Sequence, residues 1–254
     1  MFRKIFALFY GFLGFFWFWL ILLILYPFFM YVMYDPKRHK QAFWLNRIWA
    51  RVVYALMFAK VEIEMRFQPN KNQVYIYCPN HTSYLDISLM CYAAPEFVKF
   101  VGKSALLKIP LFGHMFRHLH IAVNRKDSKS RYASYQKAKE ALLNGISVCI
   151  FPEGGIYSKQ PPVMVPFKDG AFRLAIELRV PIVPVTIPHH WKMLPGISPF
   201  LYWHKIKIIF HEPISTNDMT LQHTEQLKQQ TFNIITEELK KYYPERFHHI
   251  SSTL

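Results

Sequence analysis

The segment YCPNHTSYLD, at positions 77–86, places a histidine and an aspartate five residues apart. The imidazole of His81 can take up a proton near neutral pH, and the carboxylate of Asp86 can hold that imidazole in the tautomer that accepts one. Alone, this spacing is equally typical of a capped turn that contains a structural histidine. Other polar groups that reach the same place decide between these two interpretations.

A second polar loop follows another apolar run. The segment IFPEGG (150–155) ends in Glu153, Gly154 and Gly155. Residues as small as glycine let backbone N–H groups approach a ligand closely. A plain turn is the simpler interpretation of this loop taken by itself.

The hydrophobic periodicity predicts that these loops stand at the ends of β-strands. The segment VEIEMRF (61–67) alternates apolar and polar residues, as a half-buried strand does. Further strands are predicted at 73–78, 97–101, 120–123, 146–151, 181–187 and 205–210. Helices are predicted at 83–93, 128–143, 169–178 and about 220–243, and Asn144-Gly145 is typical of a helix end.

Strands that alternate with helices indicate an α/β domain over residues 61–254, with a mixed, largely parallel sheet covered by helices on both faces. Ligands of such sheets collect beyond the carboxyl ends of the strands. The His81–Asp86 segment is expected there, as are Lys103 and Arg125, which follow other predicted strands. Surface cations are usually solvated, so neither Lys103 nor Arg125 identifies a site alone.

Composition narrows the class of protein. The 254 residues are 52% hydrophobic and 17% aromatic, with a formal net charge of +15. This apolar content excludes low-complexity disorder, and a basic surface suits nucleic acid, an anionic membrane face or acidic ligands. Cys78, Cys91 and Cys149 lie in apolar runs, so we expect buried thiols in a reducing compartment rather than disulfides.

The N-terminal segment favours the membrane among these partners. Residues 5–34 carry no charged side chain, and as a helix they would extend about 45 Å, more than the roughly 30 Å of a hydrocarbon core. Pro27 is expected to break or kink this helix. A cleaved signal peptide is less consistent, because no small-residue cleavage site follows the run. Cations flank it on both sides, which leaves its orientation open and favours both ends lying on one side of the bilayer.

The next segment, 41–60, predicts a helix with apolar residues at helical spacing and with Arg47 and Arg51 on another face. An interfacial amphipathic helix has this pattern, although ordinary core packing would also produce it. Residues 1–60 are therefore predicted to form a two-helix membrane anchor.

In order and spacing, the polar segments resemble the blocks of the PlsC-like glycerolipid acyltransferases, a family that includes 1-acylglycerol-3-phosphate and lysophospholipid acyltransferases. The resemblance covers roughly residues 75–215. The blocks fall on Asn80-His81 with Asp86 for N-H-x-x-x-x-D, on Gly102-Lys103 to Arg125, on Phe151-Pro152-Glu153-Gly154 for F-P-E-G, and on the Val-Pro-Ile-Val-Pro run at 180–184. The segment PFKDGAF (166–172), which contains Lys168, also resembles the stretch after the third block.

The resemblance implies a glycerol-3-phosphate acyltransferase-like fold and a mechanism in which His81 deprotonates a glycerol hydroxyl that attacks an acyl thioester. Asp86 would orient the imidazole and stabilise its protonated form. The implied acceptor is 1-acyl-sn-glycerol-3-phosphate, which would become phosphatidic acid, and the donor is acyl-CoA or acyl carrier protein. No metal or other cofactor is implied. The enzyme would work at the cell membrane, with its active site facing the cytoplasm.

One position departs from the family pattern. Members commonly continue E-G-T-R-S after the third block, and the arginine expected to help bind the acceptor phosphate is Ile156 here. Another cation would then have to meet the phosphate, or the acceptor would be a different lysolipid, such as a lyso-ornithine lipid. The predicted substrate-binding residues are Lys103, Arg125, Glu153, Gly154, Gly155 and Lys168, with Lys159 as a further candidate cation.

Four alternatives remain open at this point. Cys78 could be a nucleophile with His81 as its base, or the protein could bind lipid at a membrane without catalysis. Nucleic-acid binding is the least consistent, because the aromatic residues it would need lie in the hydrophobic anchor. The histidine pairs at 189–190 and 248–249 lack a spacing typical of zinc ligands.

Overall fold

A seven-stranded sheet forms the centre of the computed structural model, which describes residues 2–195 and 200–247. The strands are β1 (Val61–Met65), β2 (Ile76–Pro79), β3 (Val98–Lys103), β4 (Ile121–Val123), β5 (Ser147–Cys149), β6 (Ile182–Thr186) and β7 (Ile206–Phe210). Each of them coincides with a predicted strand to within a few residues. The apolar runs therefore located the sheet, because its strands are buried on both faces and read as near-continuous hydrophobic segments.

The sheet is mixed and largely parallel, as predicted. Its strand order is β1-β7-β6-β2-β5-β3-β4. The five strands from β6 to β4 run in one direction, whereas β7 pairs antiparallel with β6 and β1 runs parallel to β7. The carboxyl ends of β6, β2, β5, β3 and β4 consequently meet at one edge of the sheet.

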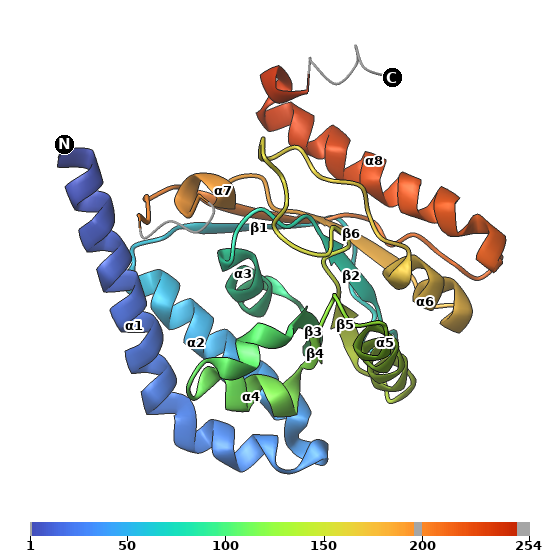
Figure 1. Cartoon of the computed structure of the whole chain (residues 1–254), viewed down its shortest axis with the longest axis horizontal. Coiled ribbons are helices and arrows are strands. Elements are labelled where there is room, and N and C mark those ends of the chain that lie inside the picture. Colours follow the sequence, from blue (N-terminus) through green and yellow to red (C-terminus); the bar gives the residue numbers. More distant parts are fainter. Residues whose placement is uncertain (1, 196–199, 248–254) are drawn as a thin grey trace.

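Helices cover both faces of this sheet (Figure 1). One face packs against α5 (Ser128–Leu143), α6 (Gly170–Leu178) and α8 (Thr224–Tyr242). The opposite face packs against α2 (Ala42–Leu56), α3 (Leu85–Ala93) and α4 (Phe112–Leu119). Short helices fill the connections: η1 (Pro36–Gln41), η2 (Ser104–Lys108), α7 (His190–Met193), η3 (Leu221–His223) and η4 (Pro244–Arg246).

The predicted helices at 83–93, 128–143, 169–178 and 220–243 correspond to α3, α5, α6 and η3 with α8. Gly145 ends α5 with φ +71°, a left-handed conformation that glycine adopts without strain. The sequence analysis missed α4. Proline and glycine commonly interrupt helices, and Pro110 and Gly113 lie here. Gly113 is nevertheless inside α4, buried against the backbone of Leu107, where a Cβ would lie only 2.4 Å from the carbonyl oxygen of Leu107.

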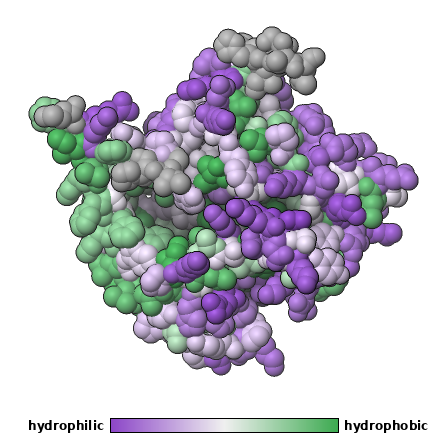
Figure 2. All heavy atoms as spheres, in the orientation of Figure 1, coloured by the Kyte–Doolittle hydropathy of each residue, from purple (hydrophilic) through white to green (hydrophobic). Residues whose placement is uncertain are grey.

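Helix α1 (Phe2–Met33) lies outside the second helical layer. It packs against α2 and α4 through fully buried Leu22 and Phe29, while about half of its remaining apolar side chains are exposed. Figure 2 shows hydrophobic residues gathered along the side of the molecule where Figure 1 places α1. Within 2–195 and 200–247, it is the one helix long and apolar enough to cross a membrane. Of the two outcomes expected at Pro27, a break or a kink, the break does not occur, because α1 continues to Met33; Figure 1 shows the helix bending towards its C-terminal end.

Helix α2 has two apolar faces. Trp49, Ala50 and Tyr54 are buried, and the Tyr54 hydroxyl lies 2.9 Å from Ser88 Oγ of α3. Trp44 and Ile48 point the other way and are 60% and 45% exposed. The helix therefore packs in the core and also presents an exposed apolar stripe. The boundary predicted at residue 60 falls in the short link between α2 and β1.

Candidate active site

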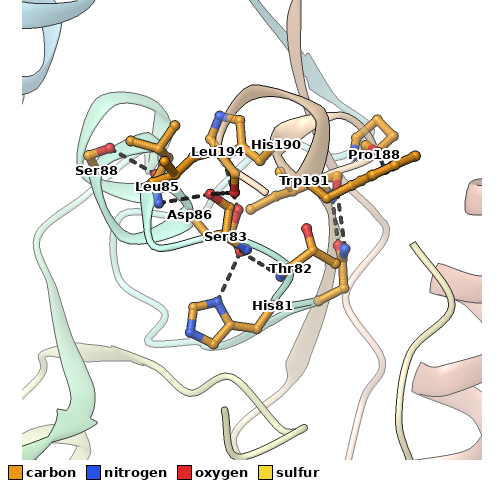
Figure 3. Close-up of polar contacts among 12 residues, drawn as sticks. His81, Thr82, Ser83, Leu85, Asp86, Ser88, Pro188, His190, Trp191 and Leu194 are labelled. Carbon is orange, nitrogen blue, oxygen red and sulfur yellow. Dashed lines mark hydrogen bonds and ion pairs between the residues drawn. The ribbon is translucent and has the colours of Figure 1, made fainter. Parts of the chain in front are cut away.

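The His81–Asp86 pair lies in the tight connection between β2 and α3 (Figure 3). His81 Nδ1 is 2.9 Å from Asp86 Oδ2. The same carboxylate oxygen accepts the backbone N–H groups of Thr82 at 2.8 Å and Ser83 at 2.9 Å. Asp86 also stands in the first turn of α3, where the helix dipole favours a negative charge.

These contacts decide the protonation of the pair. Burial raises the pKa of Asp86, but hydrogen bonds from His190 and His81 outweigh it and leave this pKa below its ordinary value. An ionised carboxylate only accepts hydrogen bonds, so the proton of neutral His81 sits on Nδ1. Nε2 of His81 then carries the free lone pair, on a residue that is 7% exposed. This arrangement suits a general base.

The loop after β5 supports His81 from the protein side. The ring of Phe151 stacks on the imidazole, with 4.0 Å between centroids. Glu153 accepts the backbone N–H of His81 at 2.6 Å through Oε1 and that of Val165 at 3.1 Å through Oε2. At 1% exposure, Glu153 ties two loops together rather than facing an open pocket. Burial raises its pKa to about 7, with the nearby Asp86 charge adding to this and the two backbone hydrogen bonds opposing it.

Lys168 lies directly over the glycines of this loop. Gly154 has φ +76°, and a Cβ built on it would stand 2.8 Å from Lys168 Cε and 3.2 Å from Nζ. The Lys168 backbone N–H donates to Pro152 O at 2.9 Å, which fixes the start of the side chain. Gly154 is therefore needed both for its conformation and for the space that the lysine occupies. Gly155 is buried beside the ring of Tyr157, and Ile156 follows it without a charge.

Lys103 and Arg125 stand farther along the same edge of the sheet. Lys103 ends β3 and Arg125 follows β4, which are two and three strands away from β2. With neighbouring strands about 4.8 Å apart, these positions are roughly 10 and 15 Å from the end of β2. Of these two cations, Lys103 therefore follows the strand that lies closer to β2.

His190 is a site residue that the sequence analysis did not connect with the dyad. Its Nδ1 lies 2.9 Å from Asp86 Oδ1, and both side chains are completely buried (Figure 3). His190 begins α7, four residues after the end of β6. Because β6 runs parallel to β2 and pairs with it, a polar residue just beyond β6 must lie near this edge, and that signal could have identified His190.

An apolar cavity of about 700 Å³ lies between α1, α2, α3 and α4 and reaches the start of α3. Tyr84 and Leu85, which directly follow Ser83, line one part of it. Aromatic and aliphatic side chains form most of the remaining wall, among them Phe12, Phe15, Phe18, Trp49, Val53 and Phe116. A cavity of this size and polarity fits a long hydrocarbon chain.

The thiol and zinc alternatives find no matching geometry. Cys78 and Cys149 are free and fully buried, as predicted, and burial raises the pKa of both thiols. His189 Nδ1 is 2.6 Å from the Tyr243 hydroxyl, whereas the neighbouring His190 contacts Asp86. The two adjacent histidines therefore have different partners. In the described part of the chain, no three His, Cys, Asp or Glu side chains converge on a possible metal position, and the pair at 248–249 lies outside the described residues.

Three features agree with the predicted resemblance to acyltransferases: a mixed α/β sheet, a His–Asp dyad at its carboxyl edge and an apolar cavity. Residues 59–188, about half of the chain, match the family model described as Acyltransferase. The chain therefore belongs to the acyltransferase family, and the predicted resemblance is confirmed.

Curated relatives agree with this assignment, and a solved structure has the same fold. The chain is 30% identical over 187 residues to a chloroplast 1-acyl-sn-glycerol-3-phosphate acyltransferase of Arabidopsis thaliana, covering 72% of this chain and 51% of that protein. It is 31% identical over 140 residues to the 1-acyl-sn-glycerol-3-phosphate acyltransferase of Haemophilus influenzae, covering 54% and 58%. The chain thus spans about half the length of the curated relatives it matches. The crystal structure of the 1-acyl-sn-glycerophosphate acyltransferase PlsC from Thermotoga maritima has the same fold, with a TM-score of 0.78 at 22% identity over 94% of this chain and 97% of that one.

Proposed function

We propose that this protein transfers a fatty acyl group from a thioester to the free hydroxyl of a lysophospholipid, with 1-acyl-sn-glycerol-3-phosphate as the acceptor and phosphatidic acid as the product. The observation that carries the proposal is the His81–Asp86 dyad, with Nδ1 engaged by a buried carboxylate and Nε2 left free. The names of the relatives support this acceptor, and the apolar cavity that reaches the start of α3 supports a substrate with a long chain.

The proposed reaction needs one base and no covalent enzyme intermediate. His81 Nε2 takes the proton of the acceptor hydroxyl while the hydroxyl oxygen attacks the thioester carbonyl. The C–S bond then breaks, an ester forms, and the proton passes from His81 to the leaving thiolate of CoA or acyl carrier protein. Asp86 keeps the imidazole oriented and stabilises its cationic form while it holds the proton. Glu153 and Phe151 fix the backbone and ring of His81 from behind.

Replacing His81 tests this mechanism. We expect His81→Ala to lower acyl transfer by about 10²- to 10⁴-fold, because the base that removes the hydroxyl proton is lost. Asp86→Asn should lower it by a similar or smaller factor. The measurement is steady-state transfer of labelled acyl-CoA to 1-acyl-sn-glycerol-3-phosphate, with the melting temperature of each variant as the folding control. Near-normal turnover by folded His81→Ala would exclude His81 as the base.

A protein that binds lipid without catalysis is the second candidate, since α1 and the cavity alone would serve it. It assigns no purpose to an imidazole buried against a carboxylate with Nε2 left free. A panel of lysolipids with labelled acyl-CoA and acyl carrier protein separates the two: product with any pair supports catalysis, and binding without product in every pair supports the lipid-binding protein.

The protein is further proposed to reside in the cell membrane through α1 and the exposed stripe of α2, with the active site on the cytoplasmic side. Free thiols and a thioester donor suit that compartment. Binding through an apolar helix should resist salt, so we expect the full chain to stay in the membrane fraction in 1 M salt and in carbonate, whereas a chain without residues 1–40 leaves it. Release of the full chain by carbonate would rule out this anchor.

A further inference from the structure

The carboxylate of Asp86 is divided between two imidazoles. Oδ2 accepts three hydrogen bonds, from His81 Nδ1 and from the backbone of Thr82 and Ser83. Oδ1 accepts its hydrogen bond from His190 Nδ1 at 2.9 Å. One oxygen is thus held by the dyad histidine and its loop, and the other by a residue from a different segment of the chain, as Figure 3 shows.

The far side of His190 fixes which of its nitrogens carries the proton. Nε2 of His190 is buried and has no hydrogen-bond partner in the described part of the chain. A proton on Nε2 would be a buried donor without an acceptor, and it would also leave the Nδ1 lone pair facing the carboxylate. The proton therefore sits on Nδ1, and His190 is a permanent donor to Asp86.

We propose that His190 is a positioning residue that sets both the orientation of Asp86 and the basicity of His81 through it. The inference rests on the proposed acyl transfer, because it concerns the base of that reaction. A hydrogen bond to Oδ1 draws negative charge away from Oδ2 and so weakens the stabilisation that Asp86 gives to protonated His81. It also prevents the carboxylate from rotating about its Cβ–Cγ bond, which keeps Oδ2 aligned with His81 Nδ1.

Removal of the His190 Nδ1–H donor should change the protonation of His81 in one direction. With Oδ1 unpaired, more negative charge is available to His81, so its protonated form becomes more stable and persists to higher pH. Because only unprotonated His81 acts as the base, the acidic limb of the kcat/KM profile then moves to higher pH. A residue that merely filled space would change activity or stability without moving that limb.

Other titratable groups surround the dyad and must be separated from His190. Glu153 faces it from the loop after β5, with a pKa raised to about 7 by burial and by the Asp86 charge. Tyr54 of α2 and Cys149 of β5 also sense the Asp86 charge, and burial raises the pKa of both well above neutrality. His189 adjoins His190 on the chain, and burial lowers its pKa to about 4. Glu153 is therefore the one of these four whose pKa lies near neutrality.

Two variants of His190 distinguish the effect of its Nδ1–H donor from the effect of the space that its ring fills. His190→Phe keeps a ring of similar size and removes the donor, whereas His190→Asn loses the ring but places an amide N–H near the position of Nδ1. We expect His190→Phe to move the acidic limb of kcat/KM upward by about 0.5 to 1 pH unit and to lower kcat roughly tenfold. His190→Asn should keep the limb at the wild-type pH. The same upward shift should appear when His190→Phe is made in a Glu153→Gln background.

A second readout does not depend on turnover. In protein carrying ¹⁵N-labelled histidine, the His81 ring is identified by its absence in His81→Ala, and its titration midpoint is followed in detergent micelles. We expect the midpoint to rise in His190→Phe and to stay in place in His190→Asn. An unmoved midpoint in folded His190→Phe, equal shifts in both variants, or a kinetic shift that vanishes with Glu153→Gln would each overturn the proposal. If the wild type transfers no acyl group to any acceptor, the proposed function fails, and the ring titration still decides the role of His190.

Discussion

Four backbone N–H groups point at the two buried carboxylates of the site. Thr82 and Ser83 donate to Asp86, while His81 and Val165 donate to Glu153. Hydrogen bonds from amides to a charged group are strong and, unlike those from flexible side chains, they cost little entropy to hold in place. The geometry of the dyad is therefore set by the path of two loops, and a substitution that shifts either loop should act on catalysis without touching a reacting atom.

On the proposed function, we infer that Lys168, which packs against Gly154, meets the acceptor phosphate in place of the arginine that the family resemblance implies at Ile156. We expect Lys168→Ala to raise the KM for 1-acyl-sn-glycerol-3-phosphate about tenfold, because a point charge beside the Gly154 loop is lost, and to change the KM for the acyl donor little. Lys71→Ala, which changes an exposed lysine in the turn that precedes β2, is the matched control. Arg125→Ala should have a smaller effect than Lys168→Ala, since Arg125 follows a more distant strand.

The same assay addresses the identity of the acceptor. Ile156→Arg should leave the KM for the phosphorylated acceptor unchanged or lower it. Acylation of a phosphate-free lysolipid such as a lyso-ornithine lipid, with none of 1-acyl-sn-glycerol-3-phosphate, would contradict the proposed acceptor and leave acyl transfer itself intact.

Helix α2 has three different environments: one face packs in the core, another is exposed, and part of the helix lines the cavity. Val53 lines the cavity, whereas its neighbour Val52 does not. We expect Val53→Trp to shift acyl transfer towards shorter fatty chains by filling the cavity, with at least a fivefold change in the ratio of short- to long-chain products. Val52→Trp should keep the wild-type ratio. Competition between acyl donors of different chain length measures this ratio. Equal ratios for the two variants would show that the fatty acyl chain does not bind in this cavity.

The fold followed from the sequence to a large extent because periodicity reports burial. Every strand was predicted, and α5 was predicted to the residue, since its pattern and its Asn144-Gly145 end agree. Helix α4 was missed because a glycine there serves close packing rather than a turn. The dyad was identified by its residue types, but the role of His190 and the cavity depend on tertiary contacts between segments over a hundred residues apart, which local patterns do not contain.

For the whole molecule, buried histidines link stability to pH. Burial lowers the pKa of His120 to about 3 and that of His211 to about 4. Both rings are tied to hydrogen-bond partners as neutral imidazoles: His120 Nδ1 accepts from the Phe100 N–H, and His211 Nδ1 accepts from Arg66. Since the unfolded chain takes up these protons near pH 6.5, their contribution to stability is complete above that pH and is lost as pH falls towards 4.

We therefore expect the free energy of unfolding of His211→Gln to rise by about 2 kcal/mol relative to that of the wild type when the pH is lowered from 7 to 5. The wild type loses the contribution of neutral His211 over this range, and the variant has no such contribution to lose. Glu153 acts in the opposite sense, since its raised pKa stabilises the fold as pH falls below about 7, so the wild type by itself should change less than either group implies. Denaturant unfolding of both proteins in detergent at the two pH values measures the difference. If the difference in unfolding free energy between the two proteins were the same at both pH values, the pKa of His211 would not differ between the folded and unfolded states.

The cavity lies between the outer helix α1 and the body of the protein, and α1 presents its apolar side outward. On the proposed membrane location, a lysolipid already resident in the bilayer reaches the dyad by sideways diffusion, without passing through water. The quantity that governs its arrival is then its mole fraction in the surface rather than its concentration in bulk solution. Diluting the acceptor with inert phospholipid at constant total acceptor should slow the enzyme, as in surface-dilution kinetics, whereas diluting the whole vesicle suspension should leave the rate per bound enzyme unchanged.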